Sequence, residues 1–264
     1  MTTNDSKQTN FGFRQVEEKE KADLVGDVFD SVSQNYDLMN DLMSFGIHRL
    51  WKKIAVETSG LRDNFKVLDL AGGTGDMVKL MRSKISNQGS IILSDINWSM
   101  LKEGRDRLID QGIEDVQIAQ IDAQHLPFKE NTFDLVTIAF GLRNVTNKQA
   151  ALESILSSLK PGGKLIVVTF HSLEDRIVKF YFKNYSSSKS NQNKYLPNLN
   201  NNNLDLFEKY KNRIITASND EIKKNPRSRS AKLRFAVRNK NMFSHPKELK
   251  LKFNYLIKLE GDNA

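Results

Sequence analysis

The sequence predicts an α/β protein built on a doubly wound, mostly parallel sheet. Short apolar runs alternate along the middle of the chain with longer amphipathic segments, as is typical of strands that alternate with helices. The first run passes directly into a glycine-rich turn, VLDLAGGTGDM, that opens the first of these segments. With 264 residues, of which 39% are apolar, the chain is long enough to bury one sizeable core. We therefore expect one large domain with appendages.

The elements are expected in the following order. Residues 1–15 are predicted to be a disordered tail, and apolar residues at helical spacing over 16–60 predict two or three helices before any strand. A core over 61–170 then follows. Its five strands are expected at 66–70, 90–95, 116–122, 133–140 and 163–170, with helices at 75–86, 98–111 and 147–159.

Residues 171–240 are expected to complete the sheet. The segment HSLEDRIVKFYFKNY predicts an amphipathic helix, in which Ser172 followed by Asp175 has the pattern of a helix N-cap. An Asn/Ser-rich insertion follows at 186–203. Two final strands are expected at 213–217 and 231–238, separated by the basic turn KKNPRSRS, and 241–264 form a basic tail.

The net charge of +8 is unevenly distributed along the chain. Residues 1–168 carry 20 basic and 23 acidic side chains, whereas residues 169–264 carry 20 basic and 9 acidic ones. All the excess positive charge therefore lies in the last third. This asymmetry favours a polyanionic partner, nucleic acid or an anionic lipid surface, for the C-terminal part only; a solvated basic face is the alternative.

Several classes of protein are excluded. The chain has no cysteine, which excludes disulfides, a thiolate nucleophile and cysteine-ligated zinc, and its four histidines contain no short-spaced pair. We expect no metal. The longest apolar run, 165–170, is too short to cross a bilayer, and the polar start MTTNDSKQTN has no apolar signal core. We therefore expect a cytoplasmic protein without a transmembrane segment.

Three features in order along the chain predict a cofactor site. Gly72, Gly73 and Gly75 allow a ligand to approach the backbone closely after the first strand, although the spacing is not the dinucleotide pattern GxGxxG. Asp95 ends the second strand, where a carboxylate can accept hydrogen bonds from ribose hydroxyls. The third strand ends in Asp122–Ala123, a position suited to the edge of an adenine.

These features together resemble the class I S-adenosylmethionine-dependent methyltransferases, which have a Rossmann-like fold. The resemblance implies S-adenosylmethionine as the methyl donor. It implies the following cofactor-binding residues: Asp69, Gly72, Gly73, Thr74, Gly75, Asp95, Asp122, Ala123 and Ala139.

A narrower resemblance covers about residues 11–166. The segments FGFR, YDLMNDLMSFGIHRLWKK, VLDLAGGTGD, DIN, LPF, NTFD and FGLRNVT resemble the ubiquinone/menaquinone biosynthesis C-methyltransferases. This implies methylation of a ring carbon of a polyprenylated quinol, with the helices over 16–60 as a lid. The enzyme would then work from the cytoplasm at the inner membrane surface, where such a substrate resides.

The C-terminal part carries a different resemblance, over about residues 160–240. The segments VTFHSLEDRIVKFYF and NPRSRSAKLRFAVR resemble the end of the small-subunit ribosomal RNA cytosine-N4 methyltransferases. We therefore hypothesise a hybrid chain joined between about Lys160 and Val168, where the charge also changes. In this interpretation residues 223–238 contact RNA, through phosphate contacts of Arg227, Arg229, Lys232 and Arg234.

Methylation of a quinol carbon requires loss of a hydroxyl proton, so the catalytic group to seek is a base or a side chain that holds a water. Arg143 and Asn144 directly follow the fourth strand, and His48 and Tyr36 lie in the leading helices. Each has a simpler alternative: Arg143 paired with a carboxylate, His48 a structural histidine, Tyr36 a packing residue. The main prediction is a quinol C-methyltransferase; the alternatives are a ribosomal RNA methyltransferase and a hybrid that binds cofactor without productive catalysis.

Overall fold

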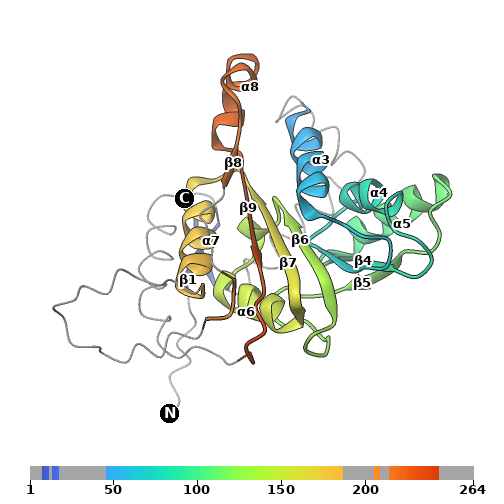
Figure 1. Ribbon diagram of the computed structural model, residues 1–264. Helices are drawn as coiled ribbons and strands as arrows, with labels where there is room; N and C mark the ends of the chain where they lie inside the picture. Colours follow the sequence, from blue (N-terminus) through green and yellow to red (C-terminus); the bar gives the residue numbers. More distant parts are fainter. Residues whose placement is uncertain (1–7, 12–13, 18–45, 187–204, 209–213, 244–264) are drawn as a thin grey trace, which may run out of the picture.

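The fold was taken from a computed structural model. The structure describes residues 8–11, 14–17, 46–186, 205–208 and 214–243. Seven strands form one sheet in the order β5-β4-β3-β6-β7-β9-β8 (Figure 1). The strands are β3 (Lys66–Leu70), β4 (Ser90–Asp95), β5 (Gln117–Gln120), β6 (Phe133–Ala139), β7 (Leu159–Thr169), β8 (Ile214–Thr216) and β9 (Lys232–Val237). The first five are parallel, and β9 is antiparallel to both β7 and β8. The predicted doubly wound, mostly parallel sheet is confirmed.

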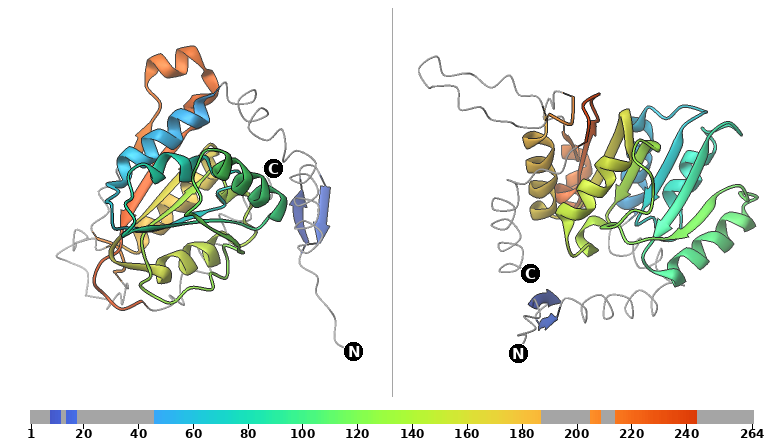
Figure 2. Two further views of the ribbon diagram at one scale, coloured as in Figure 1. Left: turned by 90° about the vertical axis from the view of Figure 1, so that its right-hand side faces the viewer. Right: turned by 90° about the horizontal axis from the view of Figure 1, so that it is seen from below.

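Helices cover both faces of this sheet (Figures 1 and 2). One layer contains α3 (Ile47–Ser59), α4 (Asp76–Arg82) and α5 (Trp98–Asp110), and the other contains α6 (Lys148–Ser158) and α7 (Ser172–Asn184). Successive side chains of β7 point to opposite faces of the sheet. Leu165 and Val167 pack in the core under α6 and α7, whereas Ile166 and Val168 pack under α3 and α4. A strand buried on both faces explains the continuous apolar run in the sequence.

Asparagine caps fix where two of the helices begin. The side chain of Asn97 accepts a hydrogen bond from Met100 N at 2.8 Å before α5, and that of Asn147 accepts one from Ala150 N at 3.0 Å before α6. The cap predicted at Ser172 is wrong by one residue. His171 is the N-cap of α7, because its Nδ1 accepts from Leu173 N at 3.3 Å.

The N-terminal region differs from the prediction where the structure describes it. Strands β1 (Gln8–Phe11) and β2 (Arg14–Glu17) form an antiparallel pair where residues 1–15 were expected to be disordered and residues 16–17 to be helical. Helix α3 packs on the sheet with Trp51 and Ala55 fully buried, so this part of the predicted lid belongs to the core. The other residues expected in the lid, 18–45, lie outside the described residues.

The C-terminal part completes the sheet as predicted, with one difference. The stretch between β8 and β9 contains helix α8 (Asn219–Lys224) and the short helix η3 (Pro226–Ser230) where a simple turn was expected. Ser218 caps α8 by accepting from Glu221 N at 3.1 Å, and Asn225 accepts from Arg227 N at 3.0 Å before η3. Most of the predicted insertion at 186–203 and of the tail at 241–264 lies outside the described residues.

Candidate functional site

The parallel strands all end at one edge of the sheet, here called the carboxyl edge. Ligands of open α/β sheets bind at this edge, near the point where the strand order reverses. In this sheet the reversal lies between β3, whose chain continues outward to β4, and β6, which starts the other half. The predicted cofactor residues all lie in or directly after β3, β4, β5 and β6, at this edge.

The loop that leaves β3 is held in a tight conformation. Gly72 N donates to Ser94 O at 2.9 Å, and Gly75 N donates to Gly72 O at 3.0 Å. Gly73 and Gly75 have φ of 56° and 82°, in the left-handed region that favours glycine. A Cβ added at Gly72 would lie 2.5 Å from Leu93 Cδ1 and 2.6 Å from Asp69 Oδ2. The predicted glycines are therefore required by the shape of the loop.

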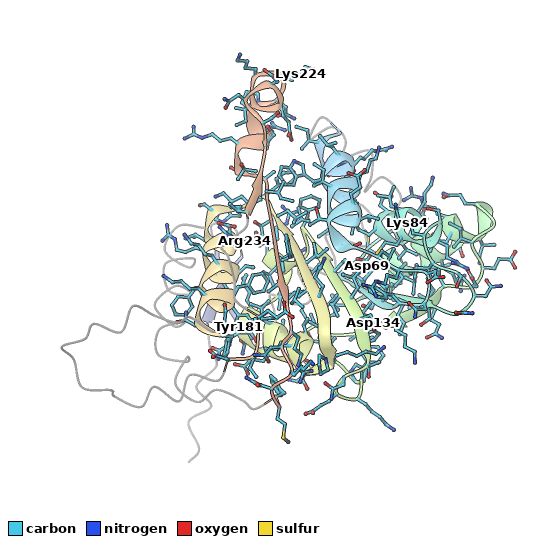
Figure 3. The ribbon with its side chains drawn as sticks, in the orientation of Figure 1. Asp69, Lys84, Asp134, Tyr181, Lys224 and Arg234 are labelled. Carbon is cyan, nitrogen blue, oxygen red and sulfur yellow. The ribbon has the colours of Figure 1, made fainter. Side chains whose placement is uncertain are left out.

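Asp69 lies fully buried beneath this loop (Figure 3). Its Oδ1 accepts a hydrogen bond from Thr137 Oγ1 at 2.7 Å, whereas its Oδ2 has no hydrogen-bond partner among the residues that the structure describes. Burial raises the pKa of Asp69 from 3.8 to about 7, against the opposing effect of the Thr137 hydrogen bond. The carboxyl group can therefore carry a proton near neutral pH.

Asp95 is oriented by backbone donors at the end of β4. Its Oδ2 accepts from Gly73 N and its Oδ1 accepts from Asn97 N, both at 3.0 Å. Burial raises the pKa of Asp95, and these hydrogen bonds oppose the rise. One carboxylate thus joins the glycine-rich loop to the start of α5, in a position to receive hydroxyl donors.

Asp122 is held in a similar way after β5. Its Oδ1 accepts from Gln124 N at 2.9 Å, and its Oδ2 lies 3.3 Å from His125 Nδ1. Gln124 Oε1 in turn accepts from Asn147 N at 3.1 Å, which ties this loop to the N-terminus of α6. Ala123 is buried and Ala139 is half-buried. The backbone here, the amide of Gln124 and the small side chains of Ala123 and Ala139 would fit a flat ring with polar atoms at its edge.

The loop after β6 faces the loop after β3. Phe140 has φ of 63°, and a Cβ added at Gly141 would lie 2.3 Å from Ala71 Cβ, so the two loops are in close contact. Phe140 also stacks on Phe170, after β7, with ring centroids 4.5 Å apart. Strands β3, β6 and β7 therefore contribute adjoining loops at the carboxyl edge.

Arg143 and Asn144 lie in this loop, in the short helix η2 (Leu142–Asn144), and both are exposed. Within the described ranges, no ion pair links Arg143 to a carboxylate, so the alternative of a structural pair gains no support. The guanidinium is thus placed at the carboxyl edge as an exposed cation.

Of the other two candidate catalytic residues, the structure describes only His48. His48 is buried in α3, at 3% exposure. Burial acts to raise the pKa of Asp76 at the start of α4, but the charge and hydrogen bond of Lys52 and the charge of Arg107 lower it overall. Lys52 Nζ lies 2.8 Å from Asp76 Oδ2, which binds α3 to α4. This surrounding favours the structural alternative for His48. Tyr36 lies outside the described residues.

Sequence reasoning missed Gly104, which supports the same loop from α5. A Cβ at this position would lie 3.0 Å from Gly73 O and 3.0 Å from the carbonyl carbon of Thr74. A glycine inside a helix costs about 1 kcal/mol relative to alanine, so its presence in the middle of α5 was the available signal. Thr137, which donates to Asp69, was also not assigned, and its signal was a polar residue within the apolar run of β6.

The family model of the ubiE/COQ5 methyltransferase family matches residues 14–200 of the chain. The chain belongs to the ubiE/COQ5 methyltransferase family. Its relatives include the ubiquinone/menaquinone biosynthesis C-methyltransferases UbiE of Methylococcus capsulatus, 55% identical over 67% of this chain and 72% of the relative, and of Cellvibrio japonicus, 53% identical over 69% and 74%. The predicted methyltransferase class is confirmed.

A comparison of solved structures confirms the fold of this family member. A chain from the complex between the Haloferax volcanii Trm112 methyltransferase activator and a methyltransferase superposes with a TM-score of 0.59. It is 15% identical and covers 83% of this chain and all of the other. The match shows a common class I methyltransferase fold and nothing narrower.

The ubiE/COQ5 match continues to residue 200, beyond the junction predicted between Lys160 and Val168. Arg234 and Lys232, which were expected to contact RNA, both lie against a carboxylate of the protein. Arg234 is buried in an ion pair with Asp175, and Lys232 Nζ lies 3.7 Å from the same carboxylate. The expectation for Arg234 is wrong, because its buried guanidinium is paired with Asp175 of α7. Arg227 and Arg229 are exposed.

Two further properties concern the part of the chain that the structure describes. Its helices include none long and apolar enough to cross a membrane. Across residues 46–186 and the other described ranges, no group of three histidine or acidic side chains is arranged to hold a metal ion.

Proposed function

We propose that the protein is an S-adenosylmethionine-dependent C-methyltransferase of ubiquinone or menaquinone biosynthesis. It would methylate a ring carbon of a polyprenylated, demethylated quinol and release S-adenosylhomocysteine. The observation that carries this proposal is the loop around Gly72, packed on buried Asp69 and hydrogen-bonded to Asp95, in a chain 55% identical to a named quinone C-methyltransferase.

The residues of the carboxyl edge fit the proposed cofactor. Asp95 would accept hydrogen bonds from ribose hydroxyls, and Asp122 and Ala123 would border the adenine. The Gly72–Gly75 backbone would lie against the amino-acid part, because Gly72 leaves no room for a side chain between the loop and Asp69. Asp69, beneath the loop, adds negative charge toward a cationic ligand when it is ionised. When bound, S-adenosylmethionine supplies a methyl group on a positively charged sulfur.

The protein's own groups must then make the quinol carbon nucleophilic. Loss of a hydroxyl proton increases electron density on the ring, so a cation that holds the resulting oxygen favours the reactive form. Arg143 is such a cation, and Asn144 beside it can hold the oxygen or a water that accepts the proton. The buried position of His48 makes it a weaker choice of base than a water held by Asn144.

The C-terminal part favours a second candidate function. We propose, from the resemblance of its segments, that residues 160–240 derive from a ribosomal RNA cytosine-N4 methyltransferase lineage. Asp175 and Arg234, which form the buried ion pair, come one from each of the two similar segments, HSLEDR and AKLRFAVR. That pairing supports a common origin for the two segments. It gives less support to RNA binding, since it removes Arg234 from the surface.

Contacts across the proposed junction argue against an unproductive hybrid. Trp51 Nε1, in α3, donates to Glu221 Oε1, in α8, at 2.9 Å. Arg238, after β9, donates to Asn131 Oδ1 at 2.8 Å and to Ser157 O at 3.2 Å. These hydrogen bonds join the part of the chain after the proposed junction to the part that contains the predicted cofactor residues. Sequencing intact DNA across codons 160–168 tests the junction: one continuous reading frame supports a genuine fusion, and two frames overturn it.

Methyl transfer from labelled S-adenosylmethionine distinguishes the functions. The protein is incubated separately with a demethylated prenylated quinol and with unmethylated small-subunit ribosomal RNA. Label in the quinol alone is the expected result. Label in the RNA alone would replace the proposal by the RNA methyltransferase, and cofactor binding without label in either substrate would leave the unproductive hybrid.

A further inference from the structure

A basic segment projects from the carboxyl edge of the sheet, beyond the family match. It comprises residues 219–230, which form α8 and η3, and is called here the cationic projection. Lys232, which follows it, pairs with Thr169 at the end of β7 and with Thr216 at the end of β8. This register places the projection at the same edge as the glycine-rich loop. In Figure 3 Lys224 lies at one end of the molecule and Asp134, at the start of β6, lies toward the other.

The charge of the projection is mainly positive and exposed. Lys223, Lys224, Arg227 and Arg229 are exposed, whereas the acidic residues of the segment are Asp220, which is exposed, and Glu221, which accepts the Trp51 hydrogen bond. Neither lysine takes part in a described ion pair. The lysines therefore present their charges to solvent, as a surface for an anionic partner.

Exposed apolar side chains accompany this charge at the same edge. The bond from Trp51 to Glu221 places the N-terminal part of α3 beside the projection, and Leu50 there is 44% exposed. Trp98, the first residue of α5 after the carboxyl end of β4, is 51% exposed. Four strand spacings separate β4 from β9, about 20 Å. The basic and the apolar residues therefore lie along the same edge of the sheet.

We infer that the cationic projection and Trp98 dock the protein on an anionic lipid surface, with the carboxyl edge facing the membrane. Lysine clusters attract anionic headgroups, and tryptophan is the side chain that favours the membrane interface. RNA also attracts lysines, but the half-exposed Leu50 beside the projection and the half-exposed Trp98, about 20 Å away along the same edge, fit a surface that has an apolar interior. The inference rests on the proposed function, because a prenylated quinol resides in that surface.

Vesicle sedimentation tests the docking surface. The full chain is mixed with vesicles of phosphatidylglycerol and phosphatidylcholine, and with vesicles of phosphatidylcholine alone. We expect binding to the anionic vesicles only. Because each lysine near an anionic surface contributes about 1 kcal/mol, the double variant Lys223→Gln/Lys224→Gln should bind about 30-fold more weakly.

The matched control is Lys129→Gln/Lys240→Gln, two exposed lysines that lie before β6 and after β9, at the opposite edge. It should bind like the unchanged protein. Equal weakening in both double variants would mean that net charge alone directs binding, which overturns the inference. Loss of thermal stability in the first variant is checked by circular dichroism, and Lys223→Arg/Lys224→Arg should then keep the binding.

Fluorescence of Trp98 provides a second measurement. The chain has two tryptophans, and Trp51 is fully buried, so a change on vesicle binding should come from Trp98. We expect a shift to shorter wavelength with anionic vesicles and no shift in Trp98→Phe. No shift in the unchanged protein bound to vesicles would contradict the predicted orientation.

Two parallel arms separate this inference from the proposed function. Methyl transfer to a short-chain demethylated quinol in detergent should be equal for the unchanged protein and Lys223→Gln/Lys224→Gln. Activity without vesicle binding would overturn the docking surface alone, whereas vesicle binding without activity would overturn the function alone. Salt-sensitive binding to small-subunit RNA in preference to anionic vesicles, lost in the same variant, would replace the lipid by RNA.

Discussion

Arg234 Nε lies 2.5 Å from Asp175 Oδ1, and Arg234 Nη2 lies 3.0 Å from Asp175 Oδ2, so a buried two-bond ion pair joins β9 to α7. Both residues are less than a tenth exposed. An ion pair of this kind is expensive to break from one side, because the remaining charge stays buried. The pair therefore fixes the helix that follows β7 against the strand that closes the sheet.

The first prediction follows from this pair. Arg234→Met should lower the free energy of unfolding by about 3–5 kcal/mol, because Asp175 would be left buried with only Lys232, 3.7 Å away. The double variant Asp175→Leu/Arg234→Met should recover most of the loss. Urea denaturation measures both. Equal stability of the single and double variants would show that the pair is not coupled.

The second prediction concerns the glycine-rich loop. Gly72→Ala should weaken S-adenosylmethionine binding by about 100-fold, because the added Cβ would lie 2.5 Å from Leu93 Cδ1 and would displace the loop. Calorimetric titration measures the affinity. Gly112→Ala is the control, since Gly112, after the C-terminal end of α5, has φ of 73° but open space around it. Similar losses in both variants would mean that general backbone strain is responsible.

The third prediction is the pH dependence caused by Asp69. Its pKa is about 7 in the folded protein against an ordinary value of 3.8, so between these values the folded state binds more protons than the unfolded state. Its contribution to stability is complete below about pH 4 and is lost as the pH rises through about 7, with a slope of at most about 1.4 kcal/mol per pH unit.

Asp69→Asn isolates this contribution. The variant keeps an oxygen that can accept from Thr137, but it has no carboxyl proton to lose. We expect the stability of the unchanged protein to fall relative to the variant from pH 4 to pH 7 and to run parallel to it above that range. Parallel curves over the whole range would show that Asp69 is ionised throughout.

The strands and the cofactor loop were predictable because their signals are local. Residues 66–70 and 90–95 form strands over the predicted bounds, since both are short runs rich in apolar residues, the first leading into the glycine-rich turn and the second ending at Asp95. Gly73 and Gly75 were predictable because each has a positive φ in its own turn, whereas the space at Gly72 is limited by Asp69 nearby and by Leu93 in the next strand along the chain. Gly104 was not assigned, since the atoms that it must accommodate, Gly73 O and the carbonyl carbon of Thr74, lie 31 and 30 residues earlier in the chain.

The role of the basic C-terminal residues could not be predicted, because a charge pattern does not reveal which partner lies beside it. Arg234 and Arg229 look equivalent in the sequence, yet one is buried against Asp175, 59 residues earlier, and the other is exposed. The cap of α7 shows the same limit on a shorter scale. A serine at position 172 is a more usual N-cap residue than a histidine. Because β7 ends at Thr169 and α7 begins at Ser172, the N-cap is nevertheless His171, one residue before the position that the pattern indicates.

The last prediction concerns Arg143. It is exposed at the carboxyl edge, in the loop after β6 whose Gly141 lies against Ala71. If its charge holds a deprotonated quinol oxygen, Arg143→Ala should reduce kcat about 100-fold or more and leave S-adenosylmethionine affinity unchanged. Arg143→Lys should recover part of the rate, because a single charge remains without the planar fork. Lys129→Ala, at the opposite edge, serves as the control, and unchanged turnover in Arg143→Ala would remove this residue from the mechanism.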